Sequence, residues 1–318
     1  MTRAALLSLP LLIALLGAAP IPVVPPDLSD AAMLRFQVNP SDRMTVPISF
    51  ANGAPHQFMI DTGAEQSAIS TELARSMNFA SRGERRVFSF AGERRVPMVR
   101  IPALSFNNRT HRSVDALTFR RGALGADGLL GIDSLVDQQV KFDFKRRTLA
   151  ISNAPKWGSQ PLVGDVRVRA ALRDGRLIMS RASANRVQID VILDTGTSVS
   201  MGNLALRREL ERTHRVGPLR RISMLAITGE VVEVDYGLLR EVVIQRTIVI
   251  QRMPIAFAVS QPFDQLGMGD RPAMLMGMDV LRSFGAVTVD FRNRKVTFQP
   301  RDDSQRRPAA RFGFTSES

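Results

Sequence analysis

The chain has 318 residues, enough for two domains, and its 44% of hydrophobic residues can fill a sizeable core. It has no cysteine, which excludes disulfides and lipoprotein processing, and its formal net charge of +13 comes mostly from arginine. The arginines are spread along the chain, with neither zinc-finger spacing nor an aromatic–basic stripe. We therefore expect a solvated basic surface and no specific nucleic-acid binding.

The N-terminus has the pattern of an export signal. Arg3 supplies a positive charge, residues 4–16 form a short apolar run, and Gly17-Ala18-Ala19 offers small residues for cleavage. The run is shorter than the about 20 residues that a membrane-spanning helix needs. We predict a signal peptide over residues 1–19 and an exported protein, periplasmic or secreted. An uncleaved membrane anchor is the alternative, because Pro20 follows the predicted cleavage site.

Two proline-containing stretches divide the remaining chain. They predict a linker over residues 20–32, a first lobe over 33–153, a second linker over 154–161, a second lobe over 162–300 and a polar tail over 301–318.

The two predicted lobes carry the same elements in the same order. In each, an apolar run ends in Asp-Thr-Gly, at residues 61–63 and again at residues 194–196. A short helix is predicted next, over residues 72–77 in the first lobe and over residues 204–214 in the second. Ser70 or Thr71 would cap the former and Asn203 the latter.

A hairpin with a glycine turn follows each helix, over residues 86–96 and 223–234. Then comes an apolar pair, a glycine and, two residues on, an aspartate, which is Asp133 in the first copy and Asp279 in the second. We predict that each aspartate caps a short helix, over residues 134–136 and 280–284. A closing pair of strands begins at Val140 and at Val287.

This repeat predicts an all-β fold with a few short helices, built from two copies of one unit. A period of roughly 110–140 residues is typical of a domain duplication and too long for a solenoid.

The repeated motifs resemble those of the aspartic protease family. Residues 61–65, Asp-Thr-Gly-Ala-Glu, are similar to the retroviral form of its motif, and residues 194–198, Asp-Thr-Gly-Thr-Ser, to the pepsin-like form. Leu129-Leu130-Gly131 and Leu275-Met276-Gly277 resemble the apolar-apolar-glycine element that follows the flap in this family. The resemblance covers about residues 40–300 and is nearest to bacterial retropepsin-like proteases. It implies two acid-protease β-barrel lobes, related by a pseudo-two-fold axis within one chain.

The resemblance also implies a site and a reaction. Asp61 and Asp194 would form a catalytic dyad, because two close carboxylates cannot both ionise and must share one proton. The pair would activate a water molecule for hydrolysis of a polypeptide, with no metal or cofactor. Thr62 and Thr195 would hydrogen-bond across the axis, and Gly63 and Gly196 would let backbone N–H groups approach the carboxylates.

The two hairpins become candidate flaps over the substrate. Phe88, Phe90 and Ala91 would line the first, and Ala226, Ile227 and Thr228 the second; plain surface hairpins are the alternative. Pepsin-like enzymes carry a tyrosine in the first flap, whereas the one tyrosine here, Tyr236, lies beyond the second hairpin. The sequence therefore leaves open whether two flaps close over the substrate.

The remaining charged residues have plainer interpretations. Asp143 and Asp290 are expected in turns or on the surface, and Glu65 in a local ion pair with an arginine. The histidines, His56, His111 and His214, lack metal-ligand spacing. Five arginines around the first hairpin would either favour acidic peptides or form a solvated face: Arg82, Arg85, Arg86, Arg94 and Arg95.

The sequence therefore predicts an exported aspartic endopeptidase. The alternatives are a peptide-binding protein of the same fold that has lost turnover, and an envelope protein whose arginines bind anionic polymers. The short linker over residues 154–161 favours a monomer whose lobes pair with each other, over a dimer in which each lobe pairs with its copy.

Overall fold

The computed structural model describes residues 32–35, 37–38, 44–50, 53–106, 109–156, 164–258 and 261–301. Four predicted segments lie wholly or mostly outside these residues: the signal peptide, the first linker, the second linker and the polar tail. Within the described part of the chain, no helix is long and apolar enough to cross a membrane. The predicted lobe boundaries stay predictions.

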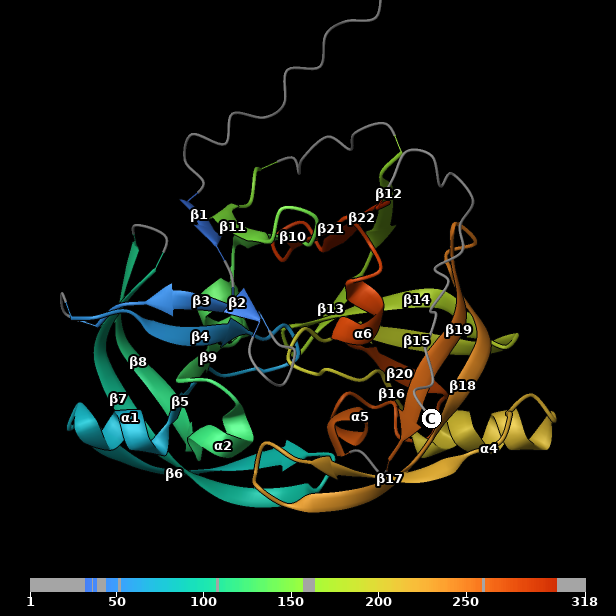
Figure 1. Ribbon diagram of the computed structural model, residues 1–318, viewed down its shortest axis with the longest axis horizontal. Coiled ribbons are helices and arrows are strands. Elements are labelled where there is room, and N and C mark those ends of the chain that lie inside the picture. Colours follow the sequence, from blue (N-terminus) through green and yellow to red (C-terminus); the bar gives the residue numbers. More distant parts are fainter. Residues whose placement is uncertain are drawn as a thin grey trace, which may run out of the picture.

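Two eight-stranded sheets form the two lobes, which lie side by side in Figure 1. The first sheet has the strand order β2 (Gln37–Val38), β3 (Met44–Ile48), β4 (His56–Ile60), β9 (Gly128–Leu130), β5 (Ala68–Ser70), β8 (Arg109–Phe119), β7 (Gly92–Phe106), β6 (Ala80–Ser89). The second has the order β13 (Ala171–Arg173), β14 (Arg176–Ala184), β15 (Val187–Leu193), β20 (Ala273–Met276), β16 (Met201–Gly202), β19 (Ile248–Phe257), β18 (Val231–Ile244), β17 (Arg220–Leu225). Position by position, the two orders are the same, so the lobes share one topology.

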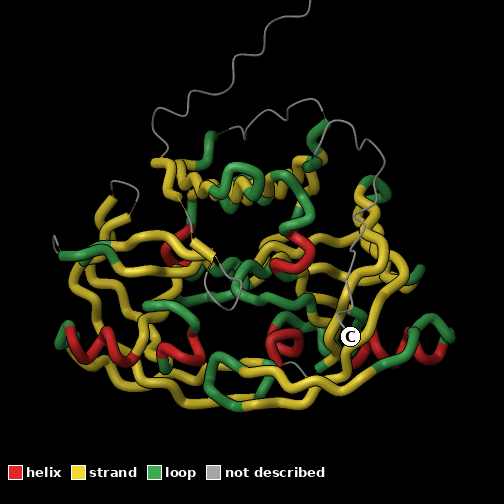
Figure 2. Tube along the Cα trace, in the orientation of Figure 1, coloured by secondary structure: helices red, strands yellow, loops and turns green. Residues whose placement is uncertain are grey.

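A six-stranded sheet joins the lobes on the side away from the hairpins (Figures 1 and 2). Its order is β1 (Ala32–Arg35), β11 (Thr148–Asn153), β10 (Gln138–Asp143), β21 (Ala286–Asp290), β22 (Lys295–Gln299), β12 (Val166–Arg169). The lobes meet where β10 pairs with β21, with Val140 opposite Val289. Both valines are fully buried and belong to a core cluster that continues into both lobes.

Six short helices occupy corresponding places in the described parts of the lobes: α1 (Thr71–Ser76) and α4 (Leu204–Arg212), α2 (Arg121–Leu124) and α5 (Gln261–Gln265), α3 (Ile132–Leu135) and α6 (Met278–Leu281). Two predicted caps are confirmed, because the N–H of Leu73 donates to Ser70 Oγ at 3.2 Å and that of Leu206 to Asn203 Oδ1 at 2.8 Å. The prediction of an all-β fold with a few short helices is confirmed as well.

The predicted caps of the last helix in each lobe are wrong. The N-cap residues of α3 and α6 are Gly131 and Gly277, so Asp133 and Asp279 lie inside the first turn. Their carboxylates accept hydrogen bonds from Ser67 and Ser200, which follow the Asp-Thr-Gly motifs, as described below. The helices accordingly begin two residues before the predicted positions.

Candidate active site

Parallel pairing of two short strands places each Asp-Thr-Gly motif. β4 pairs with β9 and β15 with β20, and the last three residues of β4 and of β15, before each motif, are buried, which explains why they are all apolar. Just past the strand ends, the N–H of Asp61 donates to the carbonyl of Leu130 and that of Asp194 to the carbonyl of Met276, each at 3.0 Å. The motif and the apolar-apolar-glycine element of each lobe are thus held together.

Two threonines lock the loops of the two lobes to each other. Thr62 Oγ1 accepts from the N–H of Thr195 at 3.1 Å and donates to the carbonyl of Leu193 at 2.9 Å. Thr195 Oγ1 accepts from the N–H of Thr62 at 3.1 Å and donates to the carbonyl of Ile60 at 2.7 Å. Both threonines are buried, so four interlobe hydrogen bonds fix the relative position of the two aspartates.

The glycines of the motifs leave room for the opposite carboxylate. A Cβ atom on Gly63 would lie 2.5 Å from Cγ of Asp194, and one on Gly196 would lie 2.1 Å from Oδ2 of Asp61. Each carboxylate therefore lies against the glycine of the other lobe, which brings the two predicted catalytic residues into one site.

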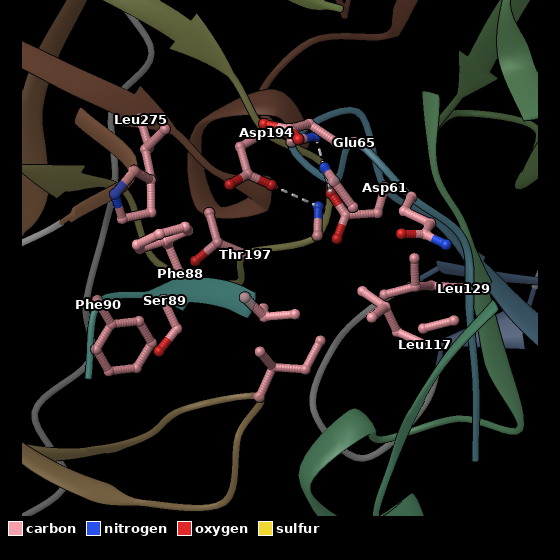
Figure 3. Close-up of a pocket in the computed structure, with 18 of the residues that line it drawn as sticks. Asp61, Glu65, Phe88, Ser89, Phe90, Leu117, Leu129, Asp194, Thr197 and Leu275 are labelled. Atoms are coloured by element: carbon pink, nitrogen blue, oxygen red, sulfur yellow. Dashed lines mark hydrogen bonds between the residues drawn. The ribbon is translucent and has the colours of Figure 1, made fainter. Parts of the chain in front are cut away.

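Backbone donors orient both carboxylates at the floor of the cleft (Figure 3). Asp61 Oδ1 accepts from the N–H groups of Gly63 and Ala64, at 2.8 and 3.0 Å, and Asp194 Oδ1 accepts from the N–H of Gly196 at 2.9 Å. Burial, followed by the nearby charge of Asp61, raises the pKa of Asp194 from 3.8 to about 7. A site with this pKa holds a proton in acidic and near-neutral solution.

A serine–aspartate pair supports each loop from below. Ser67 Oγ donates to Asp133 at 2.7 Å and accepts from the N–H of Gly131 at 3.0 Å. Ser200 makes the same two contacts with Asp279 and Gly277, at the same distances. The sequence prediction did not include these serines. Their equal spacing from the motif aspartates (67 − 61 = 6 and 200 − 194 = 6) was the signal that could have found them.

A cavity of about 340 Å³ lies between the dyad and the two hairpins. Three of the predicted flap residues line it: Phe88, Phe90 and Ile227. The others, Ala91, Ala226 and Thr228, lie in the hairpin turns and are not among the lining residues. Apolar side chains of both lobes complete the walls, among them Leu117, Leu129 and Leu275 (Figure 3).

The two hairpins meet over this cavity and exchange contacts. The hydroxyls of Ser89 and Thr228 lie 3.4 Å apart, and Arg94 Nε lies 2.5 Å from Glu230 Oε1. Phe90 of the first hairpin packs against an apolar cluster of the second lobe, while Ile227 of the second hairpin packs against one of the first lobe. Both hairpins therefore cover the cleft.

Arg176, which the sequence prediction missed, crosses from β14 to the first motif. Its Nε donates to the carbonyl of Gly63 at 2.7 Å, and its Nη1 donates to Glu65 Oε1 at 2.9 Å. Glu65 thus pairs with an arginine as predicted, but the pair is not local, because the partner lies 111 residues away in the chain. The guanidinium also opposes the rise in the pKa of Asp194, because its positive charge favours the carboxylate form.

The remaining polar residues keep structural roles. Asp143 and Asp290 accept hydrogen bonds from the backbone N–H of Arg146 and Asn293, each three residues on, and so close turns as predicted. The described residues contain no cluster of three or more His, Cys, Asp or Glu side chains that fits a metal ion.

A comparison with curated proteins found no match. Residues 46–134 match the family model of the aspartyl proteases, and this stretch contains Asp61, the first hairpin and Gly131. The second lobe repeats the same strand order around Asp194. The comparison thus identifies an aspartyl protease domain over residues 46–134 of the chain.

Proposed function

We propose that the protein is an aspartic endopeptidase in which Asp61 and Asp194 together activate water. The observation that carries the proposal is the placement of each carboxylate against the glycine of the opposite lobe, at the floor of a covered cleft. Two carboxylates so close share one proton, and the apparent pKa values belong to the pair.

In the proposed reaction, Asp194 carries the shared proton and Asp61 is ionised. Burial, followed by the nearby charge of Asp61, favours the protonated form of Asp194, which leaves Asp61 as the ionised member of the pair. Asp61 takes a proton from the water as its oxygen attacks the scissile carbonyl carbon, and Asp194 donates its proton to the carbonyl oxygen. The gem-diol collapses when Asp61 returns its proton to the amide nitrogen and Asp194 takes a proton from one hydroxyl. The C–N bond breaks, an acid and an amine leave, and the dyad regains its starting protonation.

The hairpins would exclude bulk water from this reaction. Phe88, Phe90 and Ile227 place apolar surface over the dyad, and a dry site strengthens the electrostatic interactions within it. Substrate entry then requires the flap tips to separate, because they meet across the cavity.

Cleavage-site profiling on a peptide library across pH tests the proposal, with Asp194→Asn as the control. We expect internal cleavage by the wild-type protein and none by the variant at equal circular dichroism. Binding of a statine-type peptide without cleavage of any library member would instead indicate a peptide-binding protein. Cleavage that persists in the variant would reject the dyad.

We further propose that the protein acts as an exported monomer. The pairing of β10 with β21 within one chain supports a single composite site. A solution mass of one chain, and a mature N-terminus near Pro20 after expression with an export pathway, are the expected results. A dimer mass would contradict the proposed monomer, and an intact N-terminus would contradict the proposed export with signal cleavage.

A further inference from the structure

We infer that the cleft selects peptides that carry an acidic side chain on one side of the scissile bond, and that Arg85 and Arg86 of the first flap bind this side chain. The inference rests on the proposed endopeptidase function and adds a substrate class to it. Besides the dyad, the charged residues that line the cleft are Glu65, Arg85, Arg86 and Arg176.

Arg176 and Glu65 satisfy each other. Their ion pair measures 2.9 Å, the Arg176 side chain is only 11% exposed, and its Nε is engaged by the carbonyl of Gly63. Glu65 therefore compensates Arg176, and the positive charge left over in the cleft belongs to the first flap.

Arg85 has no carboxylate partner among the described residues. Its Nη1 donates to the neutral amide oxygen of Gln66 at 2.8 Å, and the amide nitrogen of Gln66 donates in turn to the carbonyl of Asp115 at 2.8 Å. This chain of hydrogen bonds holds the guanidinium at the wall of the cleft without neutralising it. A carboxylate on a bound peptide would supply the missing opposite charge.

The positive charge of Arg86 is only weakly compensated, and its position destabilises the hairpin. Its contact with Glu93 measures 3.4 Å between exposed side chains, of which Arg86 is 65% exposed. Arg86 also lies directly opposite Arg95 in the register of β6 and β7, and like charges in this position destabilise a sheet. The fold alone therefore does not explain an arginine here, whereas binding of an anionic group does.

The lining of the cleft shows that this charge is confined to the first flap. The second flap contributes Leu225 and Ile227 to the lining, whereas its arginines Arg220 and Arg221 are not among the lining residues. The second flap thus has neutral residues where the first has two cations. An acidic side chain is bound on one side of the scissile bond only.

The cleft opens past Arg85 into a second hollow of about 430 Å³, which shares Glu65, Gln66 and Arg85 with it. Asp115 of this hollow is paired with Arg100, whereas Asp133 accepts from the neutral N–H and hydroxyl of Ser67. Arg112 adds a further positive charge to its wall. An extended peptide that leaves the cleft here passes both Arg85 and Arg112.

Paired peptides test the inference. The two peptides of a pair share one apolar scissile dipeptide, taken from the library profile. One peptide has Glu and the other has Gln at a single flanking position, and a separate pair is made for every flanking position. At one or two positions on a single side, we expect kcat/KM to be about three- to tenfold higher for Glu. The preference should shrink in high salt, since exposed charges are screened.

Charge-reversed variants assign the preference to residues. Arg85→Glu/Arg86→Glu should invert the Glu/Gln ratio, and the milder Arg85→Gln should reduce it if the double variant does not fold. Arg95→Gln is the control matched to Arg85→Gln: it removes one positive charge from the same hairpin, Arg95 does not line the cleft, and no carboxylate is placed opposite Arg86, so it should keep the wild-type ratio.

Equal rates for every Glu and Gln pair, or an equal loss of the ratio in Arg85→Gln and Arg95→Gln, would overturn the acidic preference alone. A protein that cleaves no peptide at all would overturn the proposed function, and this inference with it.

Discussion

Replacing Thr62 by valine should strongly weaken the junction between the lobes. The substitution keeps the shape of the side chain but removes the hydroxyl that accepts from the N–H of Thr195 and donates to the carbonyl of Leu193. All three residues are buried, so water cannot replace the lost partner. Each unsatisfied group costs about 1–3 kcal/mol, which gives a predicted loss of about 2–6 kcal/mol in the free energy of unfolding.

Urea denaturation monitored by circular dichroism measures this loss. Thr62→Ser is the matched control, because it keeps the hydroxyl and should lose less than about 1.5 kcal/mol. The double variant Thr62→Val/Thr195→Val should depart from additivity by about 0.5–3 kcal/mol, since both hydroxyls belong to one network. A loss below about 1 kcal/mol in Thr62→Val, or strict additivity, would refute the interlobe lock.

Three further predictions concern the dyad and the flaps. Because the pKa of Asp194 is raised from 3.8 to about 7, the folded protein keeps a proton that the unfolded chain releases. Stability relative to Asp194→Asn should therefore be greatest below about pH 4 and decline as the pH rises through about 7, by on the order of 4 kcal/mol, in urea titrations at several pH values. Gly196→Ala would place a Cβ atom 2.1 Å from Asp61 Oδ2, so the carboxylate must move. We expect kcat to fall about 10²-fold with the fold retained. An unchanged kcat would contradict this packing. Glu230→Gln removes the ion pair with Arg94 between the flaps. KM should then change by no more than about fivefold and lose part of its dependence on salt concentration. An unchanged salt dependence of KM would show that this ion pair does not hold the flaps together.

The sequence predicted the elements that depend on local pattern. The apolar runs before each Asp-Thr-Gly motif, the caps Ser70 and Asn203 and the glycine-turn hairpins all follow from neighbouring residues, and the structure contains each of them. The duplication added a long-range constraint, because equivalent positions in two copies are expected to meet at one axis. The two motif aspartates were paired on that basis.

What the sequence did not predict depends on contacts between distant segments. Arg176 reaches Gly63 from 113 residues away, and nothing in its immediate neighbourhood distinguishes it from the other arginines. Asp133 fits the pattern of a helix cap, but its carboxylate gains hydrogen bonds from the backbone and hydroxyl of Ser67, 66 residues earlier. The short helices α2 and α5 were missed because a single helical turn has too few residues to show a period.

The activity of the Asp61→Asn variant tests most directly whether the two lobes of one chain form a single catalytic site. Asparagine keeps the size of the side chain but cannot take a proton from water, so kcat/KM on a cleavable peptide should fall by about 10²–10⁴-fold or more. If each lobe instead paired with its copy in a second chain, sites built from two Asp194 residues would survive the substitution. Retention of about half of the wild-type activity per chain would therefore contradict the account, and a loss to background would support it.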